Sequence, residues 1–150
     1  MKIARRIAVP LILIIVSGVV IVLAASNLIT LNHTATVATG STLQIIDEGL
    51  APPTGGCPTT GSYGPGPLNI NWGILDQGQT KSYYVCVLNS GTATDTITLS
   101  GSPPSGYGTI TSPQAGFVLL PTATKLVELD WAMPGNASVG PVPGFSTTIS

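Results

Sequence analysis

Charge is scarce in this chain, and the few charged residues are unevenly placed. Only 7% of the 150 residues are charged, and arginine does not occur after Arg6. Beyond residue 25 the sequence holds two lysines, Lys81 and Lys125, against six carboxylates, which gives this part a formal charge of −4. Such a surface offers no basic patch for a phosphate backbone. We therefore expect no nucleic acid partner.

Side chains suited to catalysis or metal binding are equally scarce. The chain has one histidine, His33, and two cysteines, Cys57 and Cys86. Nucleophilic catalysis needs a base beside the nucleophile, and the cysteines lack the C-x-x-C spacing typical of zinc sites. The motifs of serine hydrolases, zinc proteases and P-loop proteins do not occur. We expect no enzymatic activity, no cofactor, no metal and no small-molecule substrate.

What the sequence does contain is one long apolar run near its start. Residues 7–25, IAVPLILIIVSGVVIVLAA, include no charge and follow Lys2, Arg5 and Arg6. A helix of this length would span roughly 28 Å, close to the hydrocarbon thickness of a bilayer. The basic flank predicts that the remainder lies outside the cell. An uncleaved membrane anchor and a signal peptide cut near Ala25 both fit, so the domain is expected to be tethered or secreted.

Export has consequences for two further features. An even pair of cysteines in an oxidising compartment predicts a disulfide between Cys57 and Cys86, worth about 3–4 kcal/mol for a loop of this length. Two buried free thiols are the alternative. Two N-x-S/T sequons, at Asn32 and Asn136, fall in expected loops on the exported side and are candidate glycosylation sites.

Residues 26–40, SNLITLNHTATVATG, are polar, β-branched and uncharged. They predict a linker or an extended arm rather than a helix, with His33 exposed in it. If the protein polymerises, residues 34–46 are the candidate donor strand. Residues 51–67 hold five prolines and five glycines, which predicts a loop without regular structure. Cys57 would pin this loop to the domain.

After residue 40 the sequence is typical of short strands separated by turns. LNINW, KSYYVCV and ATKLVELDW alternate apolar and polar residues, and turns are expected at 76–79 and at 89–91, where Asn and Gly tolerate a positive φ. Glu128 and Asp130 would face solvent, with a calcium site as the other interpretation. Seven or eight strands predict an antiparallel immunoglobulin-like β-sandwich over residues 41–150, with a small barrel as the alternative. The expected core and turn signature consists of Trp72, Tyr83, Val85, Val87, Asn89, Gly91, Leu129, Trp131 and Phe145.

Three stretches together resemble a known group of proteins. NINWGILDQGQTKSYYVCVLNSG, LLPTATKLVELDW and MPGNASVGPVPGFS are similar to a pattern in small archaeal surface proteins with one N-terminal membrane segment and one immunoglobulin-like domain. These domains are grouped with the ASPM/SPD-2/Hydin and NEW3 types. The resemblance covers roughly residues 68–150 and implies a fold; it carries over no catalytic residue.

The proteins that this chain resembles include filament subunits related to the TasA type. In those filaments an N-terminal strand of one subunit completes the sheet of the next. The resemblance implies a structural role at the cell surface, with self or other envelope proteins as partners. The last strand, FSTTIS, is shorter than the resemblance implies. It is expected to be either an ordinary edge strand or an edge left open for a neighbour's strand. The alternative function is an envelope ligand- or protein-binding module that uses Tyr63 and Tyr107 as exposed aromatics.

Overall fold

The described part of the chain consists of β-strands and loops. The computed structural model describes residues 29–37 and 42–150, and no helix occurs in these ranges. The strands are β1 (Ile29–Val37), β2 (Leu43–Gly49), β3 (Leu68–Leu75), β4 (Thr80–Asn89), β5 (Asp95–Thr96), β6 (Leu99–Ser100), β7 (Thr109–Thr111), β8 (Val118–Leu119), β9 (Thr124–Ala132), β10 (Gly140–Pro141) and β11 (Phe145–Ile149). The predicted all-β class is confirmed.

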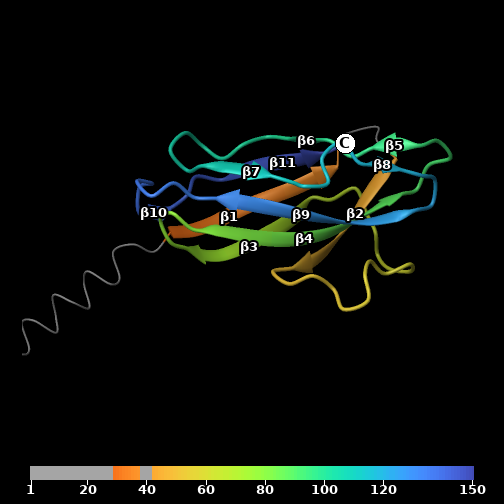
Figure 1. Cartoon of the computed structure of the whole chain (residues 1–150), viewed down its shortest axis with the longest axis horizontal. Coiled ribbons are helices and arrows are strands. Elements are labelled where there is room, and N and C mark those ends of the chain that lie inside the picture. Colours follow the sequence, from red (N-terminus) through yellow and green to blue (C-terminus); the bar gives the residue numbers. More distant parts are fainter. Residues whose placement is uncertain (1–28, 38–41) are drawn as a thin grey trace, which may run out of the picture.

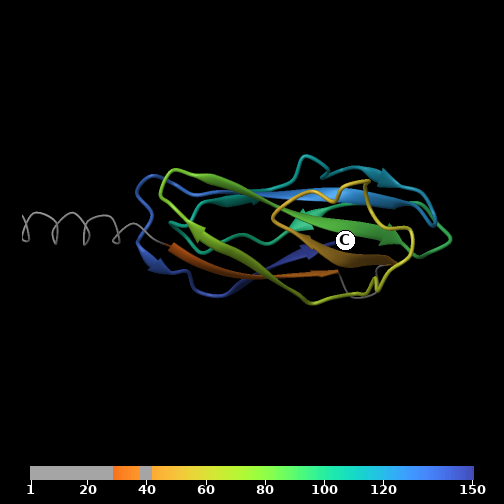
Figure 2. The ribbon, with the colours of Figure 1, turned by 90° about the horizontal axis from the view of Figure 1, so that it is seen from below.

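Two sheets face each other and enclose one core (Figures 1 and 2). In the first sheet β1 pairs with β3 on one side and with β10 and β11 on the other, and β11 also pairs with β6. The second sheet has the order β2-β4-β9-β7. Strands β5 and β8 form a separate two-stranded ribbon at the end of the molecule opposite β10 (Figure 1).

The long pair β4 and β9 forms the centre of the second sheet, as alternation predicts. Its antiparallel register sets Val85 opposite Val127 and Tyr83 opposite Leu129, and these side chains are buried. Glu128 lies on the other face, where its Oε1 accepts a hydrogen bond from the Tyr84 hydroxyl at 3.0 Å. The inward faces of these strands supply much of the apolar burial that stabilises the domain.

A β-bulge in β3 changes which of its residues face the core. Ile70 and Trp72 point inward, but the register against β1 shifts at Gly73, which has a φ of +67°. The Gly73 amide donates to Asn71 Oδ1 at 2.8 Å, and the extra residue places Leu75 in the core and Ile74 on the surface. Glycine fits here because a bulge of this kind requires a left-handed residue.

Strand β1 corrects the prediction of a linker or arm for residues 29–37, the part of 26–40 that the structure describes. Ile29–Val37 is a central strand of the first sheet, so the described domain begins before residue 41. Its pairing with β10 and β11 is parallel, and the expectation of a purely antiparallel sandwich is therefore wrong. The prediction failed because the inward positions of β1 include His33 and Ala35, which give no apolar alternation.

Other expectations at the strand ends are also corrected. The predicted donor strand 34–46 is not one strand in its described part, because residues 34–37 belong to β1 and residues 43–46 to β2 in the opposite sheet. Strand β11, predicted as an edge strand, pairs with β1 along its length and with β6 only at Thr148 and Ile149, so the edge is covered only at its end.

The predicted membrane segment at residues 7–25 lies outside the described residues. Within the described ranges, no helix has the length and apolar character needed to cross a bilayer.

Candidate functional site

The disulfide fastens a long loop onto the outer face of the second sheet. Cys57 and Cys86 are bonded, with their Cα atoms 5.6 Å apart, as the sequence predicts. Cys86 is completely buried beneath residues 51–67. The loop also pairs with the edge strand β2, because the amides and carbonyls of Ile45 and Gly64 exchange hydrogen bonds of 2.7 and 3.1 Å. The cross-link and this bridge together cover one long sheet edge.

His33 lies at the centre of the first sheet and not in an exposed linker. Its side chain is only 3% exposed. Trp72 Nε1 donates to His33 Nδ1 at 3.3 Å, so that nitrogen must be unprotonated. His33 Nε2 then carries the proton of the neutral ring and donates to Thr147 Oγ1 at 2.7 Å. The three side chains tie β1 to β3 and to β11.

The electrostatics of this site favour the neutral imidazole. Burial lowers the pKa of His33 to about 4 from its usual 6.5. The aromatic ring of Phe145 stacks on it with ring centroids 4.7 Å apart. The neighbours of the ring in these contacts are Trp72, Thr147 and Phe145, none of which carries a charge that would stabilise an imidazolium.

An aromatic cluster continues from His33 into the core. Trp72 and Trp131 meet edge to face with centroids 5.5 Å apart, and Trp131 meets Phe145 in the same way at 5.0 Å. Tyr83 also packs against Trp72. These residues were all predicted as core, and the contacts join the two sheets through geometries that aromatic rings prefer.

Asn89 organises the far end of the domain in a way the sequence did not predict. It is fully buried at the end of β4, and its amide donates to the carbonyls of Ala93 and Leu119 at 2.8 and 3.0 Å. Its Oδ1 accepts from the Gly91 amide at 2.9 Å. Neither Asn89 nor Gly91 has a positive φ, which corrects the expected turn chemistry. Gly91 is needed because a Cβ there would lie 2.7 Å from the Thr42 side chain.

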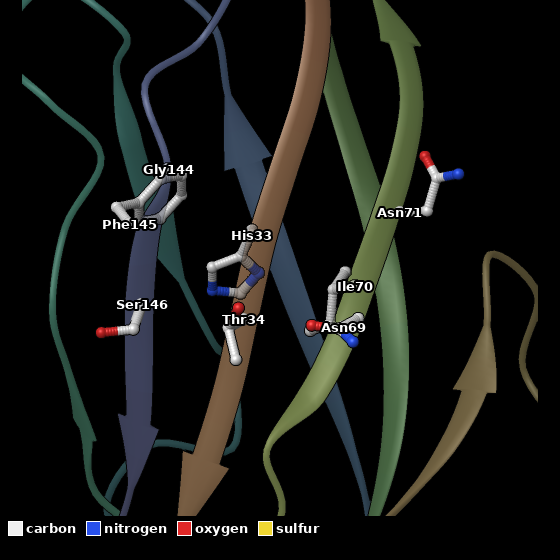
Figure 3. A pocket seen from close by; sticks show the side chains of 8 residues that line it. All are labelled: His33, Thr34, Asn69, Ile70, Asn71, Gly144, Phe145 and Ser146. Carbon is white, nitrogen blue, oxygen red and sulfur yellow. The ribbon is translucent and has the colours of Figure 1, made fainter.

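A hollow of about 540 Å³ lies along β11, β1 and β3 (Figure 3). In Figure 3, His33 on β1 lies between Phe145 of β11 and Ile70 of β3. Its lining combines amide and hydroxyl groups with the rings of His33 and Phe145 and the aliphatic side chain of Ile70. None of these groups carries a formal charge at neutral pH. The full set is His33, Thr34, Asn69, Ile70, Asn71, Gly144, Phe145 and Ser146. Such a lining suits an uncharged polar ligand.

The other candidate residues are placed as follows. Tyr63 and Tyr107 are not exposed platforms: Tyr63 is half-buried and donates to the Pro58 carbonyl, and Tyr107 packs against the core. Asn136 is exposed in the loop between β9 and β10, as a glycan site requires. Asn32 lies within β1 and so not in the expected loop.

Within the described residues, no group of three or more His, Cys, Asp or Glu side chains is placed to hold a metal ion. Asp130 accepts a hydrogen bond from the Ser82 hydroxyl at 2.6 Å, and Glu128 bonds to Tyr84. These contacts favour a solvated outer face, the first of the two interpretations of this carboxylate pair.

The side chain of Lys81, from the next strand in the sequence, bonds to the edge of β3. Among the described residues, strand β3 pairs with β1 alone, and no described strand pairs with its other side. The Lys81 ammonium donates to the carbonyl oxygens of Trp72 and Ile74, the second at 3.3 Å. Lys81 belongs to β4 in the other sheet, so its side chain brings a positive charge to the edge of β3, and a charged group at a sheet edge opposes pairing with another chain.

Replacing Lys81 by methionine should expose this edge. For Lys81→Met we expect a loss of about 1 kcal/mol in the free energy of unfolding, because the carbonyls lose a charged donor. We also expect stronger self-association, measured by analytical ultracentrifugation beside urea unfolding. Lys125→Met is the matched control, since Lys125 Nζ lies over the Phe117 ring at 4.1 Å and away from β3. Equal self-association in both variants would show that net charge, and not the edge, is responsible.

No family model, curated protein or solved structure matches this chain. The function must therefore be argued from the residues themselves.

Proposed function

We propose that the protein is a non-enzymatic structural protein of the cell surface, in which residues 7–25 hold an immunoglobulin-like β-sandwich outside the cell. The resemblance to small archaeal surface proteins supports this proposal, as do the net negative charge and the absence of basic patches in the sequence beyond residue 25. The disulfide supports export, because such bonds persist in oxidising compartments.

The observation that carries the proposal is the position of β1. It begins at Ile29, and only three residues separate it from Ala25, where the apolar run ends. It is hydrogen-bonded along both sides, to β3 and to β10 and β11. A pull on the N-terminal segment along the strand axis therefore loads two ladders of hydrogen bonds in shear. A domain built to be held by its N-terminus benefits from such an attachment.

The first test is the N-terminus and intact mass of the native protein, together with its cell fraction. A tethered domain starts near Met1 and is found in the membrane fraction, where protease added to intact cells removes the β-domain. A chain that starts near Ala25 in the medium would replace the tether with a secreted subunit. A mass in excess of the sequence would reveal attached glycans, and Asn136→Gln should remove those on the exposed sequon.

A secreted form offers a second assembly, in which β1 is donated between copies. The observation in favour is that β1 is the first described strand yet is central in its sheet. A neighbour's β1 could occupy the same register between β3 and β11.

A cross-link distinguishes the two arrangements of β1. Thr34 pairs directly with Ser146 of β11, and their side chains share a face of the parallel pair. In Thr34→Cys/Ser146→Cys, a strand held in its own domain gives an internal disulfide and a monomer on a non-reducing gel. Strand donation gives a covalent ladder that reducing agent removes. Thr34→Cys alone is the control for random intermolecular oxidation.

An envelope binding module is the candidate from a different class, and the hollow along β11, β1 and β3 favours it. Its uncharged amides and hydroxyls suit a neutral glycan. A glycan array tests this directly. Asn69→Ala should weaken any binding that uses the hollow, whereas Asn136→Ala, on an exposed loop beyond the hollow, should not. Absence of binding by the folded domain would count against this class.

A further inference from the structure

The end of the domain where β1 begins is built from two loops that are bonded to each other. We call this end the base; it consists of residues 74–79 at the end of β3 and the turn after it, the loop at 133–139 and the first residues of β1. The Met133 amide donates to the Gln79 carbonyl at 2.8 Å, and Gln77 Nε2 donates to the Ala137 carbonyl at 2.5 Å. Figure 1 places β10 and the start of β1 at this end and β5 and β8 at the other.

Two large apolar side chains are exposed at the base. Ile74 is 52% exposed and Val139 is 50% exposed. The register explains their position, because Thr30 pairs with Ile74, and Ile29 pairs with Gly140, the residue after Val139. They therefore flank the entry of the chain into the first sheet. The bulge at Gly73 turns Ile74 outward, since without it the alternation from Ile70 and Trp72 would point Ile74 into the core.

The sequence limits how far this end can stand from the apolar run. Only Ser26, Asn27 and Leu28 separate Ala25 from Ile29. Four residue steps span at most about 14 Å even when fully extended. If residues 7–25 cross a bilayer, the base must lie within this distance of the end of that segment.

We infer that Ile74 and Val139 contact the bilayer surface and fix the orientation of the domain on it. This inference rests on the proposed membrane tether and names the lipid surface as the occupant of the exposed apolar pair. Apolar side chains at such a boundary insert roughly 5–10 Å into the region between headgroups and acyl chains. The charges near this pair offset each other, because Asp76 is exposed in the turn that follows β3 and the Lys81 ammonium bonds to the Ile74 carbonyl; a zwitterionic surface therefore suits the base.

The experiment uses the full chain reconstituted in phosphatidylcholine vesicles with brominated acyl chains, which quench nearby tryptophan. Ile74→Trp and Val139→Trp place a reporter at each site on an already exposed position. Leu120→Trp is the matched control, because Leu120 is 63% exposed and follows β8 at the opposite end. The wild-type signal from the buried Trp72 and Trp131 is the baseline.

We expect both base reporters to be quenched more by bromine near the headgroups than by bromine deep in the acyl chains. The Leu120→Trp variant should show no more quenching than the wild type. If the protein floats with the vesicles but neither base reporter is quenched more than the wild type, the lipid contact is overturned and the tether stands. Failure of the wild-type chain to float with the vesicles would overturn the tether and the contact together. Two independent reporter sites guard against one variant that folds poorly.

Discussion

Removal of the disulfide is expected to lower the free energy of unfolding by about 3–4 kcal/mol. The bond links residues 29 positions apart, and a chain-entropy estimate for a closed loop of this length gives that range. Since small domains are stable by only about 5–15 kcal/mol, this is a large part of the total. Urea unfolding of the oxidised wild type and of Cys57→Ala/Cys86→Ala measures it.

Without the disulfide, local opening should increase first at the edge of β2. Two contacts attach the loop at 51–67 to the second sheet: the bridge between Gly64 and Ile45 of β2, and the Cys57–Cys86 disulfide. Hydrogen exchange at the Gly64 amide should therefore speed up in the double variant, while amides in the β4–β9 pair keep their protection. A stability loss below about 1 kcal/mol, with Gly64 still protected, would show that the loop is held by its own packing.

The parts of this fold that the sequence predicted are those where apolar and polar residues alternate. Strands β3, β4 and β9 were predicted because one face of each meets the core while the other meets solvent or a polar neighbour. The burial of Val85, Val127 and Trp131 confirms that pattern. The disulfide could be predicted because export and an even number of cysteines leave few other partners.

The parts that the sequence did not predict depend on buried polar groups and backbone irregularity. In β1 the core-facing positions include a histidine that is satisfied only by Trp72 and Thr147, residues 39 and 114 positions away. The buried Asn89 likewise depends on a remote partner, since its amide donates to the carbonyl of Leu119, 30 positions away. Periodicity cannot identify such partners, since hydrogen bonding between remote residues, and not hydrophobicity, decides their burial.

The hollow along β11, β1 and β3 was missed for the same reason. Its residues come from three segments that are far apart in the chain, and one of them was expected to be a linker. The single available signal was the lone histidine, which had been assigned to solvent. A buried neutral histidine between two strands is also the feature with the clearest consequence in solution.

Acidification is expected to loosen β1 through His33. The folded protein has a His33 pKa of about 4, whereas an unfolded chain has about 6.5, so the unfolded state binds more protons between these values. Stability is therefore fully present above about pH 6.5 and is lost as the pH falls toward 4. The shift corresponds to about 3 kcal/mol at most.

The physical reason is that a protonated ring cannot keep its present hydrogen bonds. Nδ1 would become a donor facing the Trp72 Nε1–H, and two donors cannot bond to each other. The buried charge would also lack a carboxylate partner among its hydrogen-bonding and stacking neighbours. Both effects act on the strand that joins the domain to its N-terminal segment.

The measurement is urea unfolding at pH 7, 5.5 and 4 for the wild type and for His33→Gln. Glutamine can accept from Trp72 and donate to Thr147 but does not titrate, so its variant should lack the His33 share of the acid loss. Carboxylates titrate equally in both proteins and cancel in the difference. Parallel pH profiles would show that β1 relaxes to accommodate the charge. Hydrogen exchange in β1 at pH 4.5 should accelerate in the wild type alone, because the strand between β3 and β11 is where the lost hydrogen bonds are located.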